Sequence, residues 1–181
     1  MKLYRFSPIQ NRGELLDAIE YIHFACYQLC KNSFGEYLPN AGNLGVFCHY
    51  NEEYERLVKL REELCESSDD PNQKYFKLHQ PLTIASKKDV PEITYTHLYI
   101  RKPDIYRAQV GDIDFYLEQS QYDELKHRLL ASGVVRGARV FSRQDLDMIE
   151  LFNPDIDALG YVSTNTMTKK VRIKLSDETT L

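Results

Sequence analysis

Hydrophobic residues recur at spacings of three and four in three stretches of the chain, which predicts three amphipathic α-helices. These stretches cover residues 14–31, 51–65 and 119–131. Asn11 and Asn51 stand where the first two helices should begin, and asparagine is a favoured N-cap residue. Gly35 and Gly133 follow the first and third helices, where glycine commonly ends a helix. The sequence therefore predicts the ends of these helices as well as their positions.

Several further segments either alternate apolar with polar residues or form short apolar runs, and both patterns indicate β-strands. The predicted strands cover residues 2–6, 44–50, 74–85, 93–101, 111–117, 139–141, 147–152 and 159–163. Residues 35–45, with the sequence GEYLPNAGNLG, contain three glycines, a proline and two asparagines. We therefore expect a shaped loop between the first helix and the strand that follows it.

This order of elements predicts an α+β fold with an antiparallel or mixed β-sheet, one face of which is covered by the two N-terminal helices and the later helix. A chain of 181 residues is within the size range of one domain, which we place at residues 1–163. Residues 164–181 are mostly polar. We expect them to form a C-terminal tail or, through the alternating segment KKVRIKL, an edge strand that could pair with another subunit.

Residues 93–117 contain two predicted strands whose alternation separates ionisable from aliphatic side chains. The side chains expected on the ionisable face are Tyr95, His97, Tyr99, Arg101, Asp112, Asp114 and Tyr116. The aliphatic residues between them would face a hydrophobic core. If the two strands are neighbours, they present one continuous ionisable surface to solvent or to a ligand.

Two histidines carry the candidate chemistry of this face. A turn centred near Lys88 would pair residues 74–85 with residues 93–101 and place His79 opposite His97. Imidazole titrates near neutral pH, so we predict His97 and His79 as catalytic acid and base. The predicted ligand-binding residues are Arg101, Tyr95, Tyr99, Asp112, Asp114 and Tyr116. Arg101 could hold a phosphate or carboxylate through two parallel hydrogen bonds. The segment IRKPD and Arg107 form a basic cluster that we expect to be a solvated hairpin tip, although it could also steer an anion toward this face.

A metal site is the alternative for the same face. Three pairs of the form aspartate, apolar residue, aspartate occur along the chain: Asp112 and Asp114, Asp145 and Asp147, Asp155 and Asp157. Both histidines together with Asp112, Asp114 or Glu150 would suit zinc, iron or manganese. Acidic pairs on a solvated strand face are more often a solubility feature, so we predict no metal site. The sequence identifies no cofactor.

The sequence departs from two known active-site patterns. Two-histidine phosphoesterases repeat histidine, any residue, then serine or threonine, whereas Pro81 and Tyr99 stand at the third positions here. Nucleotidyltransferases carry a Gly-Ser or Gly-Gly turn shortly before their aspartate pair, and the segment IYRAQV supplies none. The motifs therefore identify no family.

Composition narrows the classes of function. The formal net charge is −4, which gives no support for a broad nucleic-acid-binding surface. No apolar run is as long as a membrane span, and the N-terminus lacks the apolar segment of a signal peptide, so we expect a cytoplasmic protein. Four scattered cysteines are too few for a disulfide framework, and we expect them to be reduced and buried.

Two hypotheses about function follow. In the first, the protein binds, and could hydrolyse, a small anionic or phosphate-bearing ligand on the ionisable face. In the second, the protein is a non-enzymatic interaction module or a homodimer that uses the same face. The second hypothesis rests on the thirteen tyrosines, because tyrosine suits half-buried and subunit-facing surfaces.

Overall fold

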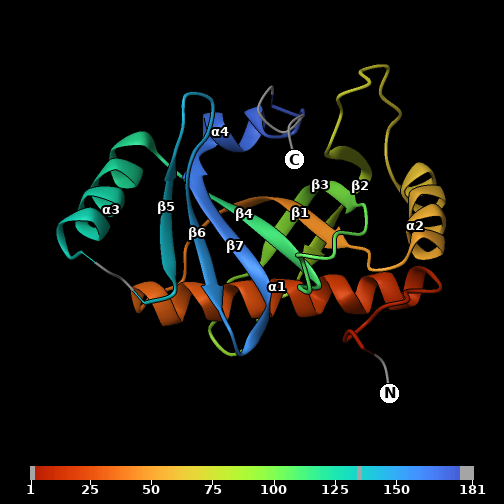
Figure 1. The fold of residues 1–181 in the computed structure, drawn as a ribbon, viewed down its shortest axis with the longest axis horizontal. Helices are drawn as coiled ribbons and strands as arrows, with labels where there is room; N and C mark the ends of the chain where they lie inside the picture. Colours follow the sequence, from red (N-terminus) through yellow and green to blue (C-terminus); the bar gives the residue numbers. More distant parts are fainter. Residues whose placement is uncertain (1–2, 134–135, 176–181) are drawn as a thin grey trace.

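A seven-stranded mixed β-sheet organises the structure, a computed structural model that describes residues 3–133 and 136–175 (Figure 1). Within these residues the chain forms a single α+β domain with four helices, which confirms the predicted fold class at this level. The elements are α1 (Arg12–Phe34), β1 (Ala41–Phe47), α2 (Asn51–Leu64), β2 (Phe76–Ile84), β3 (Ile93–Arg101), β4 (Gly111–Leu117), α3 (Gln119–Ala131), β5 (Ala138–Ser142), β6 (Asp147–Asn153), β7 (Ile156–Thr164) and α4 (Asn165–Lys170).

The strand order is β2-β3-β1-β4-β7-β6-β5, and the two halves of the sheet repeat one type of connection. In the first half β1 leads through α2 and β2 to β3, which returns parallel to β1. In the second half β4 leads through α3, β5 and β6 to β7, which returns parallel to β4. β1 and β4 pair antiparallel at the centre. Because β1 separates β3 from β4, the prediction that these two strands are neighbours is wrong.

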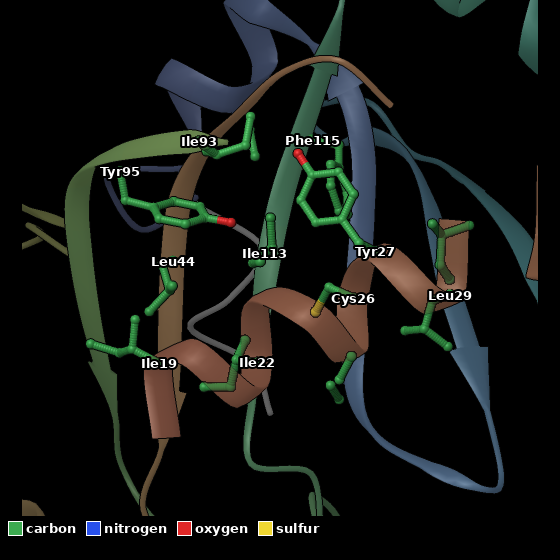
Figure 2. Close-up of a cluster of buried hydrophobic side chains, with 14 of the residues drawn as sticks. Ile19, Ile22, Cys26, Tyr27, Leu29, Leu44, Ile93, Tyr95, Ile113 and Phe115 are labelled. Atoms are coloured by element: carbon green, nitrogen blue, oxygen red, sulfur yellow. The ribbon is translucent and has the colours of Figure 1, made fainter. Parts of the chain in front are cut away.

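The hydrophobic core lies between the sheet and α1, which runs along one of its faces (Figure 1). Figure 2 shows Ile19 and Ile22 of α1 directed toward the sheet, where Leu44 of β1 and Ile113 of β4 lie. Burial of each such side chain contributes about 2 kcal/mol. α2 and α3 extend the same cluster with their own buried leucines, so all three predicted helices contribute to one core.

The ends of α1 agree with the sequence prediction. The side chain of Asn11 accepts a hydrogen bond from the backbone N–H of Glu14 at 3.0 Å. Gly35 ends the helix with a φ of 77°, a left-handed conformation that glycine adopts without steric cost. At α2 the N-cap position is Tyr50, and Asn51 is the first helical residue instead of the predicted cap.

The predicted strand at residues 2–6 is wrong over its described part, because residues 3–6 form bends; residue 2 lies outside the described residues. Side chains anchor this segment instead of a β-ladder. The ring of Tyr4 stacks on His49 with centroids 3.8 Å apart, and Arg5 Nε lies 2.9 Å from a carboxylate oxygen of Asp157. The strand predicted at residues 44–50 begins earlier, at Ala41, inside the segment expected to be a loop.

The C-terminal segment differs from the predicted tail or edge strand. Residues 165–170 form α4, and Thr164 caps this helix by accepting a hydrogen bond from the backbone N–H of Met167 at 3.2 Å. Residues 172–174 then pair with residues 72–75 of the same chain, with Lys74 N–H donating to the Arg172 carbonyl at 2.8 Å. α4 lies on the opposite side of the sheet from α1 (Figure 1). Residues 176–181 are outside the described part of the chain.

Two predictions from composition can be compared with the structure. All four cysteines are buried and carry free thiols, as predicted. None of the helices in the described ranges is both long enough and apolar enough to cross a lipid bilayer.

Candidate functional site

One row of polar side chains crosses the whole sheet on the face opposite α1. Ladder partners share a face, and the register joins one residue from each strand in the order of the sheet. The row consists of Lys77, His97, Asn43, Asp114, Tyr161, Glu150 and Arg139. We call these seven residues the polar row and the face that carries them the polar face. At its far end Arg139 forms an ion pair with the buried Glu150 at 2.5 Å.

Asp112 and Asp114 lie at the centre of the polar face, on β4. The side chains of the intervening Ile113 and of Phe115 point to the α1 core, so the two carboxyl groups point to the other side. Asp112 is only 6% exposed and Asp114 only 5%. Sequence alternation therefore predicted the correct side for both aspartates, but their depth of burial was not predicted.

A glycine makes room for the carboxyl group of Asp112. Its neighbour across the ladder is Gly45 on β1, and a Cβ atom at Gly45 would stand 2.1 Å from Asp112 Oδ1. On the other side of Gly45 the ladder partner is Tyr99 of β3. The absence of a side chain at this position thus lets a carboxyl group lie flat against the sheet between two strands.

Burial raises the pKa of Asp112 to about 7 and that of Asp114 to about 6. The charge of Asp114 raises the pKa of Asp112 further, whereas Lys74, Arg101 and Arg107 lower it. Two carboxyl groups this close cannot both ionise freely, so the pair holds a proton near neutral pH. Asp112 Oδ1 is buried and has no hydrogen-bond partner among the described residues.

The predicted pairing of His79 with His97 is wrong. His97 lies opposite Lys77, and the ladder between β2 and β3 is irregular from Lys77 to Leu82, which leaves the exposed His79 without a registered partner. Burial lowers the pKa of His97 to about 4, and the charges of Arg172 and Lys77 lower it as well. His97 is therefore a neutral imidazole at pH 7, and the two histidines do not form one site.

Tyr95 was predicted on the polar face, but it is buried on the α1 side. Its hydroxyl group lies 2.8 Å from Nδ1 of His23, a fully buried residue of α1. Tyr95 and Leu98 both face the helices although they are three residues apart, so β3 changes face between them. The irregular pairing with β2 at the same level accounts for this change, because a bulge shifts the alternation by one residue.

Replacing Tyr95 with phenylalanine is expected to lower the free energy of unfolding by about 1–2 kcal/mol, because the buried Nδ1 of His23 loses its partner. Urea unfolding at pH 7 measures this change. The matched control is Tyr106→Phe, since Tyr106 is 86% exposed and should lose almost nothing. Equal stability of both variants would contradict the proposed importance of this hydrogen bond.

The remaining predicted ligand residues lie on the polar face but have partners of their own. Arg101 forms an ion pair with Asp104 at 2.8 Å. The ring of Tyr99 packs against the ring of Tyr75, with 5.2 Å between their centroids. Tyr116 lies farther along β4, where its ring approaches Gly42 of β1 and thus the end of the sheet near α4.

Sequence reasoning missed three residues of this site. They are Asn43, Tyr161 and Arg172. A fourth, Tyr75, falls on the ionisable side of the strand predicted at residues 74–85 but is not among the predicted ligand-binding residues. The buried Tyr75 interacts electrostatically with Asp114, and the half-buried Tyr161 stands between Asp114 and Glu150 in the polar row. The alternation of residues 159–163 could have placed Tyr161 on this face. No pattern in the neighbouring sequence could have placed Asn43 on this face, because Asn43 lies within the predicted loop.

Arg107, in the connection from β3 to β4, is a cation close to the aspartate pair. Its side chain is half-buried and makes no hydrogen bond or ion pair to the residues that the structure describes. It lies near enough to Asp112 and Tyr161 for its positive charge to lower the pKa of both. The sequence prediction that Arg107 could attract an anion to this face stays a prediction.

No three histidine, cysteine, aspartate or glutamate side chains converge into a metal-binding group within residues 3–133 and 136–175. Two surface hollows lie away from the polar face. One of about 490 Å³ is lined by residues at the start of α2, including Tyr50 and Arg56. The other, of about 280 Å³, lies at the end of α2 beside Phe76. Neither hollow contains a member of the polar row.

Comparison with known proteins gives only weak similarities. No protein-family model matches the chain, and no curated protein matches it. Among solved structures, a variant of methylmalonyl-CoA epimerase from Streptomyces coelicolor, in complex with 2-nitronate-propionyl-CoA, is 15% identical over 70% of this chain and 98% of its own, with a TM-score of 0.32. A methylmalonyl-CoA epimerase in complex with methylmalonyl-CoA and NH4+ is 14% identical over 71% of this chain and 96% of its own, also with a TM-score of 0.32. Similarity at this level assigns neither a family nor an activity to the chain.

Proposed function

We propose that the protein binds a small organic anion, a carboxylate or a phosphate ester, on the polar face and exchanges a proton with it through Asp112. The observation that supports this most is the state of the Asp112 carboxyl group. Its Oδ1 atom is buried and makes no hydrogen bond to the described part of the chain, and burial raises the pKa of the carboxyl group to about 7. A carboxyl group with these properties can donate or accept a proton at neutral pH.

Arg107 supports the anionic character of the ligand. A guanidinium group without a partner can hold a carboxylate or phosphate through two parallel hydrogen bonds. The positive charge of Arg107 reaches Asp112, whose pKa it lowers, and the protonated form of Asp112 adds no negative charge that would repel an anion. Arg101 and Lys74 add positive charge near the pair, since both lower the pKa of Asp112.

The chemistry that we propose for the site is proton transfer. The proton of Asp112 would pass to a basic oxygen of the bound ligand and leave Asp112 as a carboxylate. In hydrolysis of a phosphate ester, the carboxylate would take a proton from a water molecule as the water oxygen bonds to phosphorus. The ester P–O bond would break, and the leaving alkoxide oxygen would take the proton from Asp112. A catalytic role for His97 and His79 stays a prediction, and the neutral His97 could act only as a proton acceptor.

Ligand binding is better supported than a homodimer through the same face. The centre of the polar face is already covered within one chain by Tyr75 and by the segment that carries Arg172. A second copy would have to displace this cover before it could contact Asp112 or Asp114. The homodimer, proposed from the number of tyrosines, therefore requires Tyr75 and the segment that carries Arg172 to move away from the sheet.

Binding can be tested with inorganic phosphate and malonate as probes, by titrating the isotope-labelled protein and following amide chemical shifts by NMR. We expect saturable shifts around Arg107, Asp112 and Tyr161. Arg107→Gln should weaken binding at least about tenfold, because a hydrogen-bonded charge contributes more than about 1.4 kcal/mol. The matched control is Arg128→Gln on the exposed side of α3, which should bind as the wild type does. Binding that is absent for both anions, or equal in the two variants, would exclude the proposal.

A further inference from the structure

The side chain of Asn43 is fully buried at the centre of the polar row and is held by three partners. Its Nδ2 donates to Asp114 Oδ2 at 2.8 Å and to the backbone carbonyl of Thr168 at 2.8 Å. Its Oδ1 accepts a hydrogen bond from Nε of Arg172 at 2.9 Å. These contacts join β1 to the neighbouring strand β4 and to the C-terminal segment.

The chemistry of these partners determines which way the amide group points. A backbone carbonyl can only accept a hydrogen bond, so the Thr168 carbonyl must face the amide nitrogen of Asn43. A guanidinium group can only donate, so Arg172 must face the amide oxygen. Rotating the amide by half a turn would place two acceptors together on one side and two donors on the other. The amide N–H of Asn43 is therefore fixed against Asp114.

We propose that Asn43 is a positioning residue that determines which carboxyl group of the aspartate pair holds the proton, keeping Asp114 ionised and Asp112 protonated. A hydrogen bond donated to a carboxylate favours its charged form. Asp114 receives such a bond from Asn43 at 2.8 Å. Asp112 Oδ1 receives none from the described residues, so the proton is held more tightly there.

The other charged and titratable groups around the aspartate pair do not on their own make Asp112 hold the proton more tightly than Asp114. Those that interact electrostatically with Asp112 or Asp114 are Lys74 and Tyr75 before β2, Arg101 on β3, Arg107 in the next connection, Tyr161 on β7, Arg172 in the C-terminal segment and, from the other side of the sheet, Cys26 on α1. Lys74 favours the charged form of both carboxyl groups, and each aspartate has at least one arginine of its own nearby. Among the residues that the structure describes, a side-chain donor reaches Asp114, from Asn43, and none reaches Asp112.

This assignment makes Asp112 the group that donates a proton to a ligand at neutral pH. In that respect it rests on the proposed function. It also gives the C-terminal segment a role in the site. Arg172 supplies the donor that keeps the Asn43 oxygen turned away from Asp114. The site is thus complete only when residues 165–174 lie against the sheet.

The test is a pH titration of the aspartate carboxyl carbons by ¹³C NMR in the full-length protein without any ligand. In the wild type we expect Asp112 to titrate at a higher pH than Asp114; the opposite order would overturn the proposal. Because no ligand is present, the result is independent of whether any anion binds. Site-resolved carbon signals are needed because interacting carboxyl groups share their macroscopic titration steps.

Two variants test the cause. Asn43→Leu removes the donor at similar volume, and the midpoint of Asp114 should rise by about one pH unit. Asn43→Ser keeps a hydroxyl donor and should restore part of the difference. The matched control is Thr168→Val, which removes the 3.0 Å hydroxyl contact with Ser163 but keeps the Thr168 carbonyl, so Asp114 should titrate as in the wild type. If the midpoint of Asp114 shifts equally in Asn43→Leu and Thr168→Val, the cause is looser packing around the site and not the lost hydrogen bond, and the proposal is overturned. If Asn43→Leu does not fold, the wild-type order still decides.

Discussion

Replacing Gly111 with alanine is expected to lower the free energy of unfolding by about 3 kcal/mol, at the upper end of the usual cost of overpacking. The added Cβ atom would stand 2.1 Å from the backbone carbonyl oxygen of Gly45 and 2.5 Å from Cδ1 of Ile22. A backbone oxygen within a ladder cannot rotate away. β1 and β4 would have to separate at the centre of the sheet, beside Asp112.

The matched control for this prediction is Gly42→Ala on β1. A Cβ atom at Gly42 would have its nearest neighbours, in Thr168 and Tyr116, at 3.4 Å, which is ordinary van der Waals contact. We expect its stability to stay within about 1 kcal/mol of the wild type, because alanine also reduces the freedom of the unfolded chain. Urea unfolding compares the two variants directly. Equal losses would mean that glycine is needed for backbone conformation and not for close approach.

Glycines at these positions also show why the sequence misleads around residues 35–45. A cluster of glycine, proline and asparagine indicates a loop, because these residues favour turns. Here Gly45 lies within β1 with all its neighbours buried, and its missing side chain makes room for Asp112 on the next strand. Close contact between strands and a turn both select glycine, and a single sequence does not distinguish these two reasons.

The helices and the polar face could be predicted where one period repeats without interruption. The predicted range 119–131 is the same as the observed α3, because three turns of regularly spaced apolar residues define where the helix lies in the sequence. In β4 strict alternation places Asp112 and Asp114 on one side and Ile113 on the other, as the structure confirms. In β3 the same reasoning fails at Tyr95, since a change of face within a strand leaves the composition of the segment unaltered.

The partners of the aspartate pair could not be predicted, because they come from distant parts of the chain. Asn43 and Arg172 are separated by 129 residues, and Asn43 and Asp114 by 71. Their contact depends on the insertion of β1 between β3 and β4, which is a property of the parallel return through α2 and β2. Periodicity assigns a face to each residue of a strand but does not give the order of the strands.

Replacing Asp112 with asparagine is expected to stabilise the protein increasingly as the pH rises. The folded-state pKa of Asp112 is about 7, above the ordinary value of 3.8. The folded state therefore binds this proton more tightly than the unfolded state, and wild-type stability falls as the pH rises from about 4 to about 7. Asparagine cannot ionise, so this loss is absent from the variant. The difference in unfolding free energy, variant minus wild type, should grow by about 2 kcal/mol or more between pH 5 and pH 8.

Urea unfolding of both proteins across this pH range measures the difference, with Asp17→Asn on the exposed side of α1 as the control. Buried histidines have the opposite effect on how the unfolding free energy of each protein depends on pH. Burial lowers the pKa of His23 and of His97 to about 4, so each makes the protein less stable as the pH falls below about 6.5. Both histidines are present in every variant and cancel in the difference. A difference for Asp112→Asn that does not change with pH would mean that Asp112 ionises normally, and it would remove the proton that the proposed site is meant to exchange.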